Sequence, residues 1–143
     1  LHVDILTKSD LILRDLDILR KMPSLEVGFT VTTDSPTIKE IFEPHSPPIR
    51  SRLEAARTLK ANHIRTYIFI GPVLPMNPEN LAELVAPCAD RVLIDRMNYP
   101  RKVASIYRMH GIEYALTDQY YEETKDRLRQ TLQRLSIECS IVT

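Results

Sequence analysis

The sequence predicts an α/β fold in which short buried strands alternate with amphipathic helices to build a parallel sheet. Four apolar runs of strand length are rich in β-branched or aromatic residues, and a segment with helical periodicity follows each one. The runs are Val3–Leu6, Val27–Thr32, Thr66–Ile70 and Arg91–Ile94. None alternates cleanly with polar residues, which is typical of parallel strands that are covered on both faces.

The helices between these strands are marked by apolar residues at helical spacing. The first carries four such residues on one face, and these are Ile12, Leu16, Leu19 and Met22. Further helices are expected over Pro36–Phe42, Ile49–Lys60, Pro78–Ala86 and Arg101–His110. Asn62 suits the left-handed residue that ends a helix, and Gly111 suits the same position after the last of these segments.

The chain of 143 residues is expected to form one domain, with βα units over about residues 3–110 and a less regular tail over 111–143. In the tail, Ile112–Leu116 is interpreted as a fifth short strand. Tyr120–Leu135 is expected to be a helix whose inward face carries leucines, and Ile137–Val142 a last strand. The inward leucines are Leu128, Leu132 and Leu135.

Composition restricts the possible partners. Lys+Arg and Asp+Glu are balanced at 19 each, so no overall charge attracts nucleic acid or a membrane surface. No apolar run approaches the length of a membrane-spanning helix, and no secretory signal is recognisable. Cys88 and Cys139 lie far apart without metal-type spacing, which favours a reduced, cytoplasmic protein.

Two architectures are compatible with alternating strands and helices: a doubly wound open sheet and part of a (β/α) barrel. In both, functional residues lie in the loops after the carboxyl ends of the strands. Those loops are Thr7–Ser9, Thr32–Asp34, Gly71–Pro75 and Asp95–Asn98. A glycine-rich phosphate loop is missing from the sequence, which counts against a nucleotide-binding Rossmann fold.

Lys8 is the first candidate for a binding residue. A lysine at a strand end can hold a carboxylate or phosphate as a point charge, or form a Schiff base with a carbonyl substrate. A solvated lysine beside a helix cap formed by Ser9 or Asp10 is the commoner case. Thr30, Thr32 and Thr33 follow the next strand, where they serve equally well as hydrogen-bonding groups or as β-branched sheet residues.

Glu43 and Arg52 flank a proline-rich loop and could form a polar pair or hold a charged ligand, although two solvated surface charges are the commoner case. The four histidines show neither ligand spacing nor partners for a catalytic triad. We therefore predict no catalytic residue and no metal ligand. Basic residues are not interleaved with aromatic ones in any stripe, so direct nucleic-acid binding has little support.

Four stretches of the sequence, in order, resemble one known family. Thr7–Ser9 followed by Leu13–Leu19 is similar to the middle of the radical S-adenosylmethionine proteins related to spore photoproduct lyase, which include DNA repair photolyase-like proteins. The other matching stretches are Gly28–Asp34, Glu43–Ala55 and Ile70–Pro75. Four ordered matches are more specific than any one of them, and they cover about residues 3–98.

The resemblance implies a partial (β/α)6 barrel of the TIM type that binds S-adenosylmethionine. It implies that Lys8 meets the carboxylate of this cofactor and that Thr30 or Thr32 reaches its polar groups. Glu43 and Arg52 match a Glu-Pro and an Arg-Leu pattern of the family and are expected to belong to the same site. The loop prolines Pro72 and Pro75 are implied to shape the chain beneath the adenosyl group.

The sequence departs from the family at its defining element, the Cys-x-x-x-Cys-x-x-Cys loop that ligates a [4Fe–4S] cluster. Cys88 and Cys139 cannot replace it, because the cluster needs three thiolates on one short loop. The chain is therefore expected to correspond to the C-terminal part of a longer enzyme, not to bind the cluster, and to be inactive alone.

Its expected partners are the N-terminal part of the barrel or a second copy bound through an exposed sheet edge. For the parent protein the resemblance also implies DNA as a partner. Relatives act on a thymine-dimer lesion, so lesion repair is the function that the resemblance implies. Two alternatives stay open. One is a lyase or aldolase-like barrel fragment that uses Lys8 as a Schiff-base nucleophile, and the other is a stand-alone α/β binding or assembly module.

Overall fold

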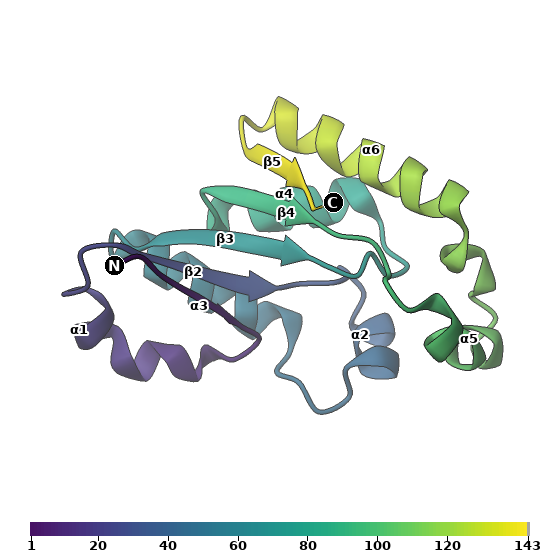
Figure 1. Cartoon of the computed structure of the whole chain (residues 1–143), viewed down its shortest axis with the longest axis horizontal. Coiled ribbons are helices and arrows are strands. Elements are labelled where there is room, and N and C mark those ends of the chain that lie inside the picture. Colours follow the sequence, from purple (N-terminus) through teal and green to yellow (C-terminus); the bar gives the residue numbers. More distant parts are fainter. Residues whose placement is uncertain (143) are drawn as a thin grey trace.

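A computed structural model describes residues 1–142 and shows one sheet of five strands, all parallel (Figure 1). The strands are β1 (Val3–Thr7), β2 (Leu25–Thr30), β3 (Arg65–Ile70), β4 (Arg91–Ile94) and β5 (Glu138–Ile141). They lie in the sheet in the order in which they occur in the chain. The predicted α/β class and parallel sheet are confirmed.

Helical segments connect each strand to the next. The α-helices are α1 (Leu16–Leu19), α2 (Pro36–Phe42), α3 (Ile49–Ala61), α4 (Pro78–Val85), α5 (Pro100–Met109) and α6 (Asp118–Arg134). Short 3-10 segments complete the connections: η1 (Asp10–Asp15), η2 (Ala86–Cys88) and η3 (Glu113–Leu116). Side-chain caps begin several of them, as where Ser35 accepts from the Ile38 amide and Thr117 accepts from the Tyr120 amide.

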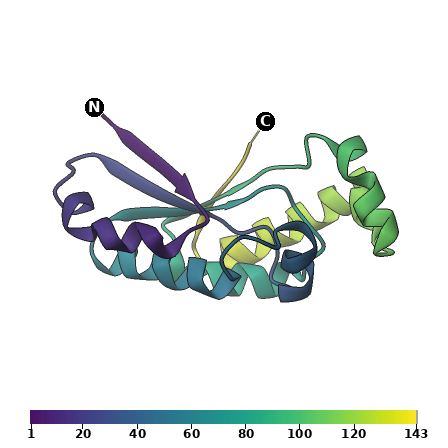
Figure 2. The same cartoon turned by 90° about the horizontal axis from the view of Figure 1, so that it is seen from below.

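The strand order decides between the two predicted architectures. A doubly wound sheet reverses its strand order at a switch point and carries helices on both faces. Here every strand is followed by its sheet neighbour, so right-handed crossovers place the helices on one face only. Figure 2 shows α1, α3, α4 and α6 along the same side of the sheet. This is the winding of a (β/α) barrel, seen as an open part of one.

The main hydrophobic core lies between the sheet and these helices. Its strand residues are fully buried and come from one side of the pleat: Val27, Phe29, Ile68, Ile70, Val92 and Ile94. The helices contribute Leu59, Leu81, Val85, Leu128 and Leu132, also fully buried. Burying such side chains stabilises the fold by about 1.5–3 kcal/mol each before conformational entropy is counted.

Among the described residues the other face of the sheet carries no helix, and the expectation that the four predicted strands are covered on both faces is wrong for the edge strand β1. Exposure alternates along β1 and along β5, because every second side chain points away from the helices. Leu6 on this face is 49% exposed. The central strand β2 is nevertheless buried on it at Glu26, Gly28 and Thr30, and Tyr67 of β3 is buried there as well.

Three local predictions are wrong. The segment interpreted as a fifth strand is the 3-10 segment η3, since β5 already occupies the free edge of β4 and pairs with it in parallel. The left-handed residue after α3 is His63, with φ of 64°, whereas Asn62 has φ of −96° and caps the helix end. Leu135 is 41% exposed, because α6 ends one residue before it. Gly111 does have the predicted left-handed backbone, with φ of 66°.

Across the part of the chain that the structure describes, helices of membrane-spanning length and apolarity are absent.

Candidate functional site

The candidate site lies where the carboxyl ends of β1 and β2 meet the loop after α2. Lys8 directly follows β1, and Thr30 is the last residue of the neighbouring strand β2. Glu43 is the first residue after α2. The Lys8 Nζ lies 2.6 Å from the Glu43 Oε1, so residues from two separate βα units form an ion pair at the strand ends.

Arg52 in α3 holds this arrangement together, and its side chain is wholly buried. Its Nη1 donates to the Thr30 carbonyl at 3.0 Å, while its Nε and Nη2 both donate to the Pro47 carbonyl, at 3.0 and 2.9 Å. A buried guanidinium needs such partners for its five N–H donors. Arg52 therefore ties the end of β2 to the proline-rich loop.

The same guanidinium also neutralises Glu43. The Arg52 Nη1, which donates to the Thr30 carbonyl, also lies 3.0 Å from the Glu43 Oε2 and forms an ion pair with it, while the Oε2 has no partner in hydrogen-bond geometry among residues 1–142. Burial raises the pKa of Glu43, but the hydrogen bond from Lys8 and the charge of Arg52 lower it by more, and the resulting pKa is below its ordinary value. Glu43 is therefore ionised at neutral pH.

Lys8, Glu43 and Arg52 together carry one net positive charge, and of the three side chains only that of Lys8 is well exposed to solvent. The side chain of Lys8 is 42% exposed, whereas that of Glu43 is 8% exposed and that of Arg52 is 0% exposed. An ammonium has three N–H donors, and Glu43 uses one of them. Lys8 can thus offer donors to an incoming anion while Glu43 and Arg52 keep it in place.

A second cation fixes the loop from the other side. Lys39 in α2 is buried, and its Nζ donates to the Ser46 carbonyl at 2.5 Å and contacts the Glu40 carboxylate at 3.0 Å. Together with Arg52 it anchors the segment between Glu43 and α3. Lys39 could not be recognised from the sequence, because nothing in its spacing distinguishes it from a solvated lysine on a short helix.

The threonines after β2 have different surroundings. The Thr33 Oγ1 donates to the Pro75 carbonyl at 2.7 Å and accepts from the Ser35 amide at 3.1 Å, so it joins the loop after β3 to the start of α2. Thr32 is only 2% exposed, and its Oγ1 has no hydrogen-bond partner within residues 1–142. An unpaired buried hydroxyl costs about 1–3 kcal/mol. Among residues 1–142 the Thr32 hydroxyl is therefore buried and unpaired.

The structure thus brings Lys8, Thr30, Glu43 and Arg52 to one place, with the backbone carbonyl of Thr30 as the group in contact with Arg52. Of the alternatives that the sequence left open for Glu43 and Arg52, the structure shows the polar pair. The interpretation of these two residues as solvated surface charges is wrong, because the chain crosses from α2 to α3 in a way that buries both.

The thiols do not suit metal or cluster binding. Cys88 in η2 is buried and Cys139 in β5 is half-buried, and burial raises the pKa of both. A metal ligand must be a thiolate, which this environment disfavours. Within residues 1–142, no group of three His, Cys, Asp or Glu side chains is arranged to hold a metal ion. These residues do not fit an iron–sulfur cluster.

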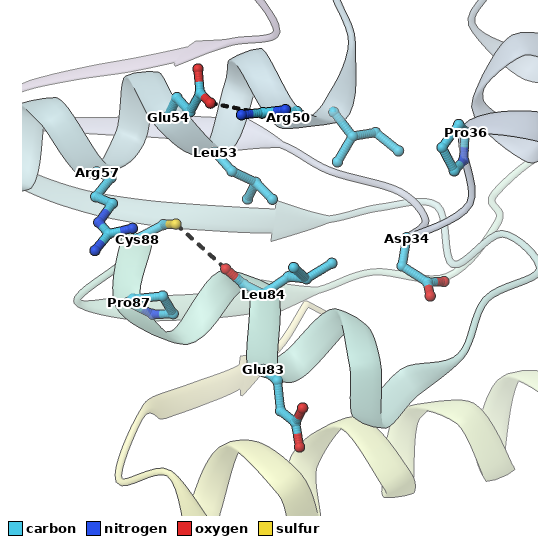
Figure 3. A pocket seen from close by; sticks show the side chains of 11 residues that line it. Asp34, Pro36, Arg50, Leu53, Glu54, Arg57, Glu83, Leu84, Pro87 and Cys88 are labelled. Carbon is cyan, nitrogen blue, oxygen red and sulfur yellow. Dashed lines mark hydrogen bonds and ion pairs between the residues drawn. The ribbon is translucent and has the colours of Figure 1, made fainter.

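A separate cavity of about 480 Å³ lies on the outer surface between α3 and α4 (Figure 3). Leu53, Leu84 and Cys88 point into it, and the Arg50–Glu54 ion pair borders it. Its lining is mostly apolar and brings no set of reactive groups together. The strand-end site around Lys8 therefore has the better chemistry for binding a charged ligand.

Comparison with known proteins gives one sequence relative and several similar structures. The chain matches no family model. Over 74 residues it is 45% identical to an uncharacterized protein of Methanocaldococcus jannaschii; the match covers 52% of this chain and 29% of that protein. The matched region is thus less than a third of the relative's length, and the relative has no described function.

Structural similarity points to spore photoproduct lyase. One variant of that enzyme superposes with a TM-score of 0.67 at 14% identity, over 98% of this chain and 50% of the enzyme. Another variant, with bound AdoMet and dinucleoside spore photoproduct, superposes with a TM-score of 0.64 over the same shares. At 14% identity the likeness concerns the fold, which this chain shares with half of spore photoproduct lyase.

Proposed function

We propose that this chain is part of a radical S-adenosylmethionine enzyme related to spore photoproduct lyase, in which the ends of β1 and β2 bind S-adenosylmethionine. The fold shared with that enzyme supports the proposal, as do the four ordered sequence stretches that resemble its family. The observation that carries it is Lys8, a half-exposed cation held at a strand end by a buried carboxylate.

The amino-acid end of S-adenosylmethionine carries a carboxylate and an ammonium. In the proposal Lys8 binds the carboxylate as a charge-assisted donor, which is stronger than a neutral hydrogen bond. Glu43 and Arg52 position Lys8, and the side chain of Thr30 or Thr32 reaches the ligand's polar groups. The loop carrying Pro72 and Pro75 lies next to this segment, since the Leu74 amide donates to the Thr32 carbonyl at 3.3 Å.

The cluster of such enzymes supplies the electron that cleaves the cofactor, and this chain's residues only place the cofactor. Because Cys88 and Cys139 do not fit the cluster, we assign its cysteines to another part of the parent protein. That part would also cover the helix-free face of the sheet. A lesion in DNA is the proposed substrate of the parent enzyme, by similarity to spore photoproduct lyase.

The Schiff-base alternative has less support. A Schiff-base lysine is commonly activated by an apolar pocket or a neighbouring cation. Lys8 instead contacts a carboxylate at 2.6 Å and is 42% exposed, so its surroundings do not match that chemistry.

Binding of S-adenosylmethionine to the chain, measured by isothermal titration calorimetry, tests the proposal. Lys8→Ala should weaken binding by about tenfold or more, since a hydrogen bond to a charged group contributes about 1.5–3 kcal/mol. Arg14→Ala is the matched control, because Arg14 is an exposed cation in the adjacent segment η1 and should leave binding unchanged. Equal affinity of Lys8→Ala and wild type would remove Lys8 from the site and with it the basis of the proposal.

A further inference from the structure

The outer face of α5 is basic. From Arg96 to Ile112 the chain has four Lys or Arg residues and no Asp or Glu, although the whole chain is balanced at 19 of each sign. Within α5, Arg101, Lys102 and Arg108 are all exposed. At 100° per residue these three fall on the same half of the helix, with exposed Ser105 and Met109 between them.

These cations have no carboxylate partner, unlike several others on the surface. Arg96 pairs with Asp118, and Arg127 pairs with Glu79 at 2.6 Å. Arg101, Lys102 and Arg108 form no ion pair with any of the residues that the structure describes. Their charges are therefore available to an external anion.

The opposite side of α5 fixes the helix to the body. Tyr107 is wholly buried, and its ring centroid lies 4.9 Å from that of Phe42 at the end of α2. Val103 packs in the same small cluster, around Leu74. Phe42 directly precedes Glu43, so this packing holds α5 beside the candidate site. Figure 1 shows α5 beyond the carboxyl ends of the strands.

We propose that the outer face of α5, formed by Arg101, Lys102 and Arg108 with Tyr99 at its start, binds the phosphate backbone of a single-stranded or locally unpaired nucleic acid. The biological meaning of this surface rests on the proposed function, since a strand bound here would pass next to the strand-end site. Its affinity for nucleic acid does not depend on S-adenosylmethionine.

The spacing of the cations suits a polynucleotide. Arg108 lies seven positions after Arg101, a rise of about 10 Å along the helix axis. Successive nucleotides of one strand rise about 3.4 Å, so the two guanidinium groups bracket about three of them. Tyr99 is 67% exposed, and the Lys102 Nζ lies 4.8 Å from its ring centroid, which combines a stacking ring with a cation at one end of the surface.

A membrane surface fits less well. An interfacial helix buries its apolar face among lipid chains. In α5 that face carries Val103 and Tyr107, which are packed against the protein, and Met109 is the large apolar residue left exposed on the helix. An exposed aromatic side chain beside unpaired cations instead favours unstacked bases and their phosphates.

Fluorescence anisotropy with a labelled single-stranded oligodeoxynucleotide of about 15 nucleotides tests the inference. If three ion pairs form, wild-type affinity should fall by about 20-fold between about 50 and about 200 mM salt. The triple variant Arg101→Ala, Lys102→Ala, Arg108→Ala should bind at least about tenfold more weakly at low salt and lose most of that salt dependence. The matched control is Arg14→Ala, Arg20→Ala, Lys21→Ala, which removes the same charge from exposed positions in and after η1 and α1.

Loss of binding confined to the α5 variant, with circular dichroism unchanged, supports the inference. An equal loss in both triple variants would show that only net charge matters and would overturn it. Wild type that fails to bind the oligonucleotide at low salt, or that binds phosphatidylserine vesicles and not the oligonucleotide, would also overturn it. Calorimetry with S-adenosylmethionine on the same proteins separates the two proposals: a chain that binds oligonucleotide but not the cofactor retains this inference and loses the proposed function.

Discussion

The two faces of the sheet exclude water by different means, and β2 shows both within one strand. Val27 and Phe29 point to the helices and are wholly buried in the apolar core. Glu26 and Gly28 alternate with them on the helix-free face, where Glu26 is 5% exposed although no helix lies above it. Burial on this second face comes from ion pairs and a tyrosine ring, so its stability should respond to charge and pH as the core does not.

The charged cluster centres on Glu26. Its Oε2 accepts from the Arg65 Nε and the Arg91 Nε, each at 2.9 Å, and its Oε1 accepts from the Arg91 Nη2 at 2.5 Å. Arg91 lies 4.9 Å above the ring of Tyr67, whose hydroxyl donates to the Asp4 carboxylate at 2.8 Å. Tyr67 reaches Asp4 by lying across β2 at Gly28, since a Cβ there would be 2.2 Å from its ring.

The largest effect is expected on the helix-covered face. Phe29→Ala should destabilise the fold by about 3–5 kcal/mol, because it leaves a cavity in a closely packed core. Urea unfolding followed by circular dichroism measures the loss. Leu6→Ala is the control on the open face, where the side chain is 49% exposed, and it should cost less than about 1 kcal/mol. Similar losses for the two variants would contradict the distinction between the faces.

Gly28→Ala should have an intermediate effect, about 1–3 kcal/mol, since the added methyl group displaces the Tyr67 ring and its bond to Asp4. A double-mutant cycle provides the control. In a Tyr67→Ala background the methyl group meets no ring, so the same substitution should cost almost nothing. A cost for Gly28→Ala that is the same in both backgrounds would show that the ring is not the obstacle.

The smallest effect is expected from Glu26→Gln, about 1 kcal/mol near pH 7, because the amide keeps one acceptor for the arginines. The hydrogen bond from Arg91 is the largest influence on the pKa of Glu26, and with the charges of Arg91 and Arg65 it lowers that pKa despite burial. A pKa that is lower in the folded state gives stability that is present above the unfolded value and lost as the pH falls through the folded one.

The stability difference between wild type and Glu26→Gln should therefore shrink as the pH drops below about 4.3. Urea unfolding of both proteins from about pH 7 to about pH 3 measures it, and the other carboxylates cancel in the difference. A difference that stays constant over this range would mean that the ion pairs do not stabilise the fold.

Much of the fold could be predicted because strands and helices have local signatures. The strand Arg91–Ile94 and the helix Pro36–Phe42 have the predicted bounds, and the left-handed backbone of Gly111 agrees as well. The wrong predictions concern positions whose structure depends on contacts with other parts of the chain. Ile112–Leu116 has strand-like residues, but the edge of β4 is taken by β5. Leu135 continues the periodicity of α6 one residue beyond the helix.

The positions of several candidate residues could be predicted for the same reason. Strand ends in a parallel sheet gather at one edge, so Lys8 and the threonines after β2 were correctly placed there. The burial of Glu43 and Arg52 and the anchoring role of Lys39 had no local signal, since each residue type is common on surfaces. The basic face of α5 can be recognised only when the structure shows which side of the helix is buried against the protein.

By itself the sequence determined the succession of strands and helices, because hydrophobic period and β-branched runs act over a few residues. It also determined that the loops after the strands would carry the polar groups. Only the tertiary structure decided that the sheet is covered on one side, that Glu26 is buried without a helix above it, and that Lys8 meets Glu43. Periodicity reports whether a position is buried, whereas the partner that makes a buried charge stable comes from a distant part of the chain.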